Sequence, residues 1–188
     1  MDIKKFWDEG LTYDEYIALS QKRLDHPANE EEAEKREYYE LALQRMSRMT
    51  KRYVPDAGQV EAFAGKNFDG KVLIITEPWC GDASQAVPVA NKFFEKNGVR
   101  ITLRDQEPSL IDDFLTDGAK SIPIILFIDD NWKVVAQWGP RPAFGYELFL
   151  KYKANPEEYT KEQFHNDLQV YYAKNKGYDT IEEILDKL

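Results

Sequence analysis

Apolar residues in the segment up to Pro55 recur with the period of a helix. Thr12-Tyr13-Asp14-Glu15 has the composition of a capping box, in which the threonine hydroxyl accepts from a free backbone amide and the glutamate reaches back. It predicts a helix that continues to about Leu24. Asn29 can cap a longer second helix, because the glutamates that follow it suit the positive end of the helix dipole. Val54-Pro55 ends that second helix.

A methionine and aromatic stripe follows one face of the second helix. Its members recur at helical spacings, as the buried side of an amphipathic helix does. Such a stripe is far more often packing than a cofactor site, so we interpret it as core. Its members are Tyr38, Leu41, Ala42, Arg45, Met46 and Met49.

Beyond Gly70 the pattern changes to short apolar runs. Lys71–Thr76 is rich in β-branched residues and apolar on both faces, which is typical of a buried central strand. Residues 83–96 predict a helix that Pro88 would kink. Val99–Arg104 then alternates between apolar and polar positions, so strand, helix and strand form a βαβ unit.

The next segment predicts a hairpin. Pro108–Leu115 reads as a short helix, and Ile122–Ile128 as a further strand. The turn Asp129–Asn131 separates this strand from a returning strand at Trp132–Trp138. Together with the preceding unit, the hairpin predicts a mixed sheet with helices on both faces.

The remaining sequence is helical. One helix begins near Phe144, and another is expected to restart at Asn155-Pro156, because asparagine is a good cap and proline suits the first turn. Asp179 is expected to cap a last short helix. No internal repeat or low-complexity tract interrupts these elements.

Composition and charge narrow the class of protein. The chain has 188 residues, of which 43% are hydrophobic and 13% aromatic, which favours a packed domain with a helical extension over a disordered chain. The net charge is −9, and the basic residues form no stripe. Nucleic acid and anionic membranes are therefore not expected as partners, since both require clustered cations. The oligomeric state is left open.

The N-terminal nine residues lack the apolar segment and cleavage site of a secretory signal, and no window has the length of a membrane span. A cytoplasmic location is expected. Cys80 is the one cysteine, so an intramolecular disulfide is excluded. With only His26 and His165 as further candidates, we expect no metal site and no cofactor.

Cys80 lies in Glu77–Ala83, between the first predicted strand and the proline-containing helix. Trp79-Cys80-Gly81 resembles the start of the Trp-Cys-Gly-Pro-Cys motif of thioredoxin, and Ile122-Pro123 resembles that family's cis-proline dipeptide. Pro88 and Gly139 also fall at matching positions, in the active-site helix and after the last strand. The joint spacing makes the resemblance specific.

The resemblance covers about residues 58–150. It implies an α/β fold, a thioredoxin-like three-layer sandwich around a central mixed sheet. An N-terminal helical extension (1–57) and a C-terminal helical extension (151–188) would pack on this core. Together with Ser121–Pro123 and Trp138–Pro142, the motif Trp-Cys-Gly-Asp-Ala is similar to a bacterial thioredoxin-like branch.

A cysteine that opens a helix lies where backbone amides and the helix dipole lower a thiol pKa, so Cys80 is the candidate catalytic nucleophile. The resemblance also shows what is missing. Ala83 occupies the position of the resolving cysteine, Asp82 that of the motif proline, and Ile74 that of a buried acid. Without a second thiol, an external thiol would have to release the partner from a mixed disulfide.

The charges near Cys80 have opposing effects. Asp82 in the first helical turn would oppose ionisation of the thiol by like-charge repulsion. Arg141 is expected to offset that repulsion, to hold an anionic ligand, or to remain a solvated loop residue. Ser84 is expected either to bond the sulfur or to face solvent.

Two functions follow from these features. The first is a monothiol disulfide oxidoreductase, in which Cys80 attacks a disulfide of a protein or a low-molecular-weight thiol. The alternative is a binding module without catalysis, which presents the groove near Pro123 to an extended peptide or another subunit. Cys80 would then be a retained small hydrophobe. An iron–sulfur carrier is disfavoured, because the Cys-Gly-Phe-Ser motif of monothiol glutaredoxins is absent. The groove common to the first two consists of Trp79, Gly81, Asp82, Ile122, Pro123, Gly139 and Arg141.

Overall fold

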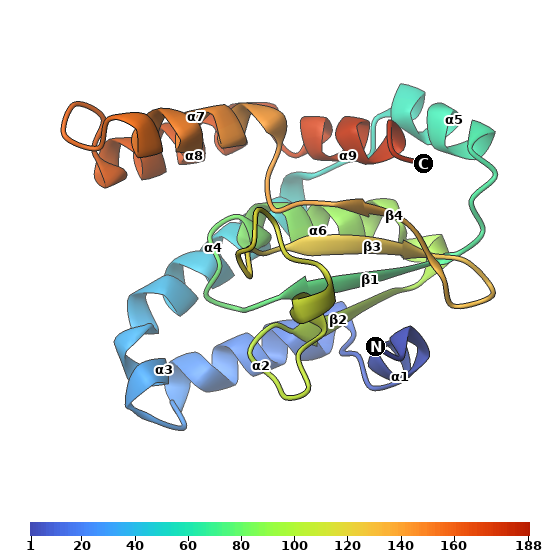
Figure 1. The fold of residues 1–188 in the computed structure, drawn as a ribbon, viewed down its shortest axis with the longest axis horizontal. Coiled ribbons are helices and arrows are strands. Elements are labelled where there is room, and N and C mark those ends of the chain that lie inside the picture. Colours follow the sequence, from blue (N-terminus) through green and yellow to red (C-terminus); the bar gives the residue numbers. More distant parts are fainter.

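A four-stranded mixed sheet lies at the centre of the computed structural model, which describes residues 1–188 (Figure 1). The strand order is β2-β1-β3-β4. β1 pairs with β2 in parallel and with β3 antiparallel, and β4 pairs antiparallel with β3, so the predicted mixed sheet is confirmed. The bounds are β1 Lys71–Thr76, β2 Val99–Leu103, β3 Ile124–Ile128 and β4 Val134–Trp138.

Nine α-helices surround the sheet. In Figure 1, α6 lies behind the strands, and the segment between β2 and β3 crosses in front of them. That segment contains a 3₁₀ helix at Leu110–Asp113, which is shorter than the helix predicted over 108–115. None of the helices combines the length and the apolar character that crossing a bilayer requires. The helices are α1 Ile3–Asp8, α2 Tyr13–Asp25, α3 Glu30–Glu34, α4 Arg36–Arg52, α5 Ala57–Gly65, α6 Ala83–Phe93, α7 Ala143–Ala154, α8 Lys161–Asn175 and α9 Tyr178–Leu185.

α2 and α3 begin where the sequence predicts, whereas α1 and α5 were not predicted. The Thr12 hydroxyl accepts from the Glu15 amide at 3.2 Å, and the Glu15 carboxylate accepts from the Thr12 amide at 2.8 Å. Asn29 caps α3. The second predicted helix is divided at Lys35 into α3 and α4, whereas the pattern predicted one continuous helix.

The prediction that the methionine and aromatic stripe of α4 is buried in the core is partly wrong. Tyr38 is 58% exposed and Leu41 is 45% exposed. The reason is that α4 packs through a neighbouring row of side chains, whose spacings of three and four residues face α2 and α6. That row consists of Tyr39, Ala42, Met46 and Met49, all buried.

One hydrophobic cluster joins the sheet to both ends of the chain. It includes Phe6 and Tyr16 from the N-terminal helices, Ile74 from β1 and Ile181 from α9. A smaller separate cluster lies between α7 and α8, around Phe164. The extensions therefore contribute to the same packing that holds the sheet.

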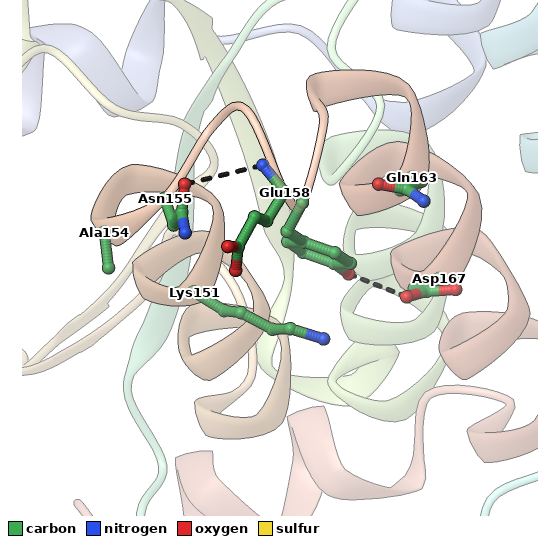
Figure 2. A pocket seen from close by; sticks show the side chains of 7 residues that line it. Lys151, Ala154, Asn155, Glu158, Gln163 and Asp167 are labelled. Carbon is green, nitrogen blue, oxygen red and sulfur yellow. Dashed lines mark hydrogen bonds between the residues drawn. The ribbon is translucent and has the colours of Figure 1, made fainter.

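The helix predicted to restart at Asn155-Pro156 begins later. Asn155 follows the end of α7, and its side chain accepts from the Glu158 amide at 3.4 Å within the connecting turn (Figure 2). α8 starts after Thr160, which forms a second capping box with Gln163. Asn155 is thus a turn residue, because its side-chain bond stabilises the turn and not a helix start.

Asp179 is not the cap of the last helix, as was predicted. Gly177 precedes α9 in a left-handed conformation with φ +90°, and Asp179 lies inside the first turn. Its carboxylate accepts from the Tyr171 hydroxyl at 2.7 Å. This contact with α8 occupies the side chain that would otherwise cap.

A candidate binding cleft at Cys80

Cys80 lies in the turn that joins β1 to α6. Its amide donates to the Glu77 carbonyl, and its carbonyl accepts from the Ser84 amide, both at 3.0 Å. Cys80 is 7% exposed, and its Sγ–H donates to the Ile122 carbonyl at 3.4 Å. The Ile122–Pro123 bond is cis, as expected. The turn and the residue before Pro123 thus meet at the thiol.

The electrostatic surroundings of Cys80 disfavour a thiolate. Burial raises the pKa of Cys80 to about 12, and the negative charge of Asp82 adds to the rise. The amides of Ala83 and Asp82, together with Arg141, act in the opposite direction. The expectation that the helix start lowers this pKa is wrong, because loss of hydration outweighs the backbone amides.

Asp82 is the centre of a buried polar network. Its carboxylate accepts from the Tyr172 hydroxyl at 2.6 Å and from Arg141 Nη2 at 2.8 Å. Burial raises the pKa of Asp82, and the charge of Arg141 opposes that shift. Arg141 is therefore an ion-pair partner and not a solvated loop residue. The network joins the start of α6 to α8 and to the loop before α7.

Three other positions near the thiol contribute no acid or base. Ser84 is buried and donates to the Gly81 carbonyl at 2.6 Å, so both expectations for its hydroxyl are wrong. The reason is that this carbonyl lies three residues earlier, within reach of the serine side chain. Ala83 and Ile74 are completely buried.

Glu77 is a buried carboxylate that sequence reasoning did not single out. It accepts from Arg23 Nη1 at 3.0 Å and from the Asp105 amide at 2.9 Å. Burial raises the pKa of Glu77, and both hydrogen bonds oppose the shift. This carboxylate therefore links α2, the end of β1 and the segment after β2 behind the Cys80 turn. The sequence signal that could have identified Glu77 is an acidic residue directly after a buried strand.

A cleft of about 680 Å³ opens beside Cys80. Its volume lies within the range of about 300–1,000 Å³ typical of ligand sites. The structure brings six of the eight predicted site residues to its lining, and it places Pro123 and Gly139 outside the lining. The six are Trp79, Cys80, Gly81, Asp82, Ile122 and Arg141.

The other walls of the cleft come from distant segments. α4 supplies Tyr38, Leu41 and Arg45, and α8 supplies Phe164 and His165. Sequence reasoning did not assign these residues to the site. The signal that could have found the α4 wall is the second apolar row on that helix, which is more than one buried face requires.

Gly139 supports the cleft from behind. Its φ is +135°, and a β-carbon there would lie 2.1 Å from the Pro123 carbonyl oxygen. The glycine thus permits the loop after β4 to pass directly against the backbone of Pro123. It is a packing position and not a lining residue.

Gly139→Ala is expected to lower the free energy of unfolding by about 2 kcal/mol or more, because backbone strain and overlap with Pro123 act together. Chemical denaturation measures the loss. Gly118→Ala is the matched control, since Gly118 also has positive φ, +76°, but open space around it. Equal losses in the two variants would contradict the role of the contact with Pro123.

No group of three or more His, Cys, Asp or Glu side chains is arranged to hold a metal ion. The ionisable side chains described above at the cleft are Cys80, Asp82 and Arg141. Each of these has a position fixed by more than one element of the fold.

Comparisons with known proteins agree on the fold. The chain is similar to the crystal structure of an HIV epitope scaffold, with a TM-score of 0.61, 13% identity, and coverage of 100% of this chain and 97% of the scaffold. It is also similar to PA1234 from Pseudomonas aeruginosa, a protein of unknown function, with a TM-score of 0.51, 14% identity, and coverage of 93% and 99%. Such identities show the fold alone. No curated protein sequence matches the chain.

A family model described as Thioredoxin matches residues 28–159. The match extends beyond the segment 58–150 for which the motifs predicted the resemblance, and it includes α4, which forms one wall of the cleft. It covers well over half of the sequence. The chain therefore belongs to the thioredoxin family.

Proposed function

We propose that this protein is a thioredoxin-fold binding module, whose cleft beside Ile122 holds a partner without thiol exchange. The observation that carries the proposal is the state of Cys80 within the cleft. The thiol is almost completely buried, donates to the Ile122 carbonyl, and has a pKa raised to about 12. Because the thiolate is the nucleophile, such a thiol is a poor starting point for attack on a disulfide.

The surroundings of Cys80 support the same proposal. A reductase with two thiols would need a second cysteine where Ala83 is buried. Asp82, the nearest ionisable side chain on the turn, is already engaged by Arg141 and Tyr172. Neither position offers a group that resolves a mixed disulfide.

The second candidate is a monothiol disulfide oxidoreductase that uses an external thiol. One observation favours it, which is that Cys80 lines the cleft. A partner bound there would lie beside the sulfur. A shift in the Cys80 surroundings on binding would then have to expose the thiol and lower its pKa.

Turnover separates the two functions. We expect reduction of a peptide–glutathione mixed disulfide by glutathione to proceed at the same rate with wild type, with Cys80→Ser and without protein. A buried thiol adds nothing to the uncatalysed exchange. Turnover above background that disappears in Cys80→Ser would contradict the binding module and establish the oxidoreductase.

Retention of partners provides the complementary measurement. Proteins retained by immobilised wild type are expected to be retained equally by Cys80→Ser and lost with Ala119→Trp. Ala119 is exposed and lines the cleft, so a tryptophan there occupies cleft space without entering the core. Loss of retention in Cys80→Ser alone would indicate a covalent role for the thiol.

A further inference from the structure

The lining of the cleft contains more basic than acidic side chains, in contrast to the chain as a whole. The whole chain carries 34 acidic and 25 basic residues. The lining of the cleft contains one acid, Asp82, and five cations: Lys35, Arg45, Arg104, Lys120 and Arg141. At physiological salt, charges separated by more than about 8 Å are largely screened. A ligand in the cleft therefore experiences the nearby side chains more than the net charge of −9.

Four of the five cations form two groups around the Cys80 turn. Lys35 Nζ and the Arg104 guanidinium lie 4.9 Å and 4.8 Å from the centre of the Trp79 ring. Arg45 and Arg141 form the second group. Arg45 Nη1 lies 3.6 Å from the position that a β-carbon would take on Gly81, and Arg141 donates a hydrogen bond to the next residue, Asp82. Two cationic groups suit a ligand that carries more than one acidic group.

Arg45 is the lining cation that has no acidic partner. The others pair with acids: Lys35 with Glu31, Arg104 with Asp105, Lys120 with Asp112 and Arg141 with Asp82. Arg45 is half-buried, yet it forms no ion pair and donates no hydrogen bond within the chain.

Burial and the neighbouring Arg48 lower the pKa of Arg45. The Nε atom of Arg141 is also buried without an acceptor. A buried donor without an acceptor is costly, as at Arg141 Nε, and the half-exposed Arg45 guanidinium is free to pair with an incoming carboxylate.

The apolar part of the cleft restricts the ligand further. Tyr38, Leu41 and Arg45 lie at spacings of three and four residues on α4, so one helix face presents two exposed apolar side chains and the free guanidinium together. Trp79 and Phe164 add aromatic surface. A bare phosphate or a small dicarboxylate would leave this surface uncovered. A peptide with alternating acidic and apolar side chains would use both.

We infer that the cleft binds a short peptide segment in which acidic and apolar residues alternate, with Arg45 as a principal contact for a carboxylate. This inference rests on the proposed binding function and names its ligand class. It assigns a direct role to the α4 wall, which the motif around Cys80 does not include.

Fluorescence anisotropy with three labelled hexapeptides tests the inference: alternating glutamate and leucine, glutamine and leucine, and lysine and leucine. We expect the glutamate peptide to bind at least about tenfold more tightly than the glutamine peptide, and the lysine peptide not to bind. The affinity of the glutamate peptide should fall as salt rises. Equal affinity for the glutamate and glutamine peptides would overturn the inference, as would preference for the lysine peptide.

Arg45→Gln is expected to weaken binding of the glutamate peptide by about five- to tenfold. Arg48→Gln is the matched control, because Arg48 is on the same helix and half-buried but lines a different cavity, and its effect should stay below about twofold. Displacement of the peptide by an equal concentration of succinate would indicate a small-anion site and overturn the peptide inference. So would equal effects of the two substitutions.

Cys80→Ser distinguishes this inference from the proposed function. Binding of the glutamate peptide by the wild type, with no Cys80-dependent thiol turnover, supports both. Failure of the glutamate peptide to bind while turnover is absent overturns the ligand class alone. Cys80-dependent turnover overturns the binding module, whatever the peptide affinities are.

Discussion

Cys80 is expected to react with iodoacetamide at pH 8 about a thousandfold more slowly in the folded protein than in the chain unfolded in guanidinium chloride. With its pKa raised to about 12, the thiolate is present in about one molecule in 10⁴ at that pH. An ordinary thiol with a pKa near 8.5 is roughly a quarter ionised. Burial of the sulfur hinders the reagent further. The measurement is unambiguous because the chain has one cysteine.

The pH profile of the same reaction tests the cause. The rate for the folded protein should keep rising between pH 7 and pH 10 without a plateau, because a group with a raised pKa stays protonated through this range. Cys80→Ser should give no labelling at any pH. A plateau reached below pH 8 would contradict the buried, protonated thiol and return Cys80 to the role of a nucleophile.

Local patterns predicted most of the fold correctly. The capping box at Thr12, the apolar run of β1 and the alternation in β2 each depend on neighbouring residues alone, and each element begins where the pattern indicates. The predicted caps at Asn155 and Asp179 were wrong for two different reasons. Asn155 accepts from the Glu158 amide three residues later, as a cap would, but the turn that it stabilises does not continue as a helix. The Asp179 carboxylate accepts from the Tyr171 hydroxyl of α8, a contact that depends on the tertiary arrangement.

The motif around Cys80 predicted the position of one wall of the cleft, but it did not predict the facing wall. Trp79, Cys80 and Asp82 are contiguous in the sequence, so a family resemblance could place them. The facing wall comes from Tyr38 and Arg45, on a helix whose buried row could not be distinguished from its exposed row by periodicity alone.

The titration of Cys80 also depends on contacts that are distant in sequence. Its Sγ–H donates to the carbonyl of Ile122, and Tyr172 holds the neighbouring Asp82 from 90 positions away. The helix start predicted a lowered pKa, but the packing of these segments removes water from the sulfur. Desolvation of this kind cannot be read from the motif.

Asp82→Leu is expected to lower the free energy of unfolding by about 3–5 kcal/mol, the range typical of removing one partner from a buried ion pair. The substitution leaves the Arg141 guanidinium without its carboxylate and the Tyr172 hydroxyl without its acceptor. For a chain of this size the melting temperature should fall by roughly 6–20 °C. Urea denaturation followed by circular dichroism measures the change in free energy.

A second substitution shows whether the loss comes from the stranded charge. Arg141→Met in the Asp82→Leu background should recover much of the stability, because apolar replacement of both partners of a buried pair is often neutral. Tyr172→Phe alone should cost about 1.5–3 kcal/mol, the range for one hydrogen bond to a charged group. The network would be contradicted if the double variant were as unstable as Asp82→Leu. It would also be contradicted if Asp82→Leu itself were within about 0.5 kcal/mol of wild type. If the expected pattern is found, Asp82 is the residue that fixes α8 and the loop before α7 against α6, and so holds the walls of the cleft in place.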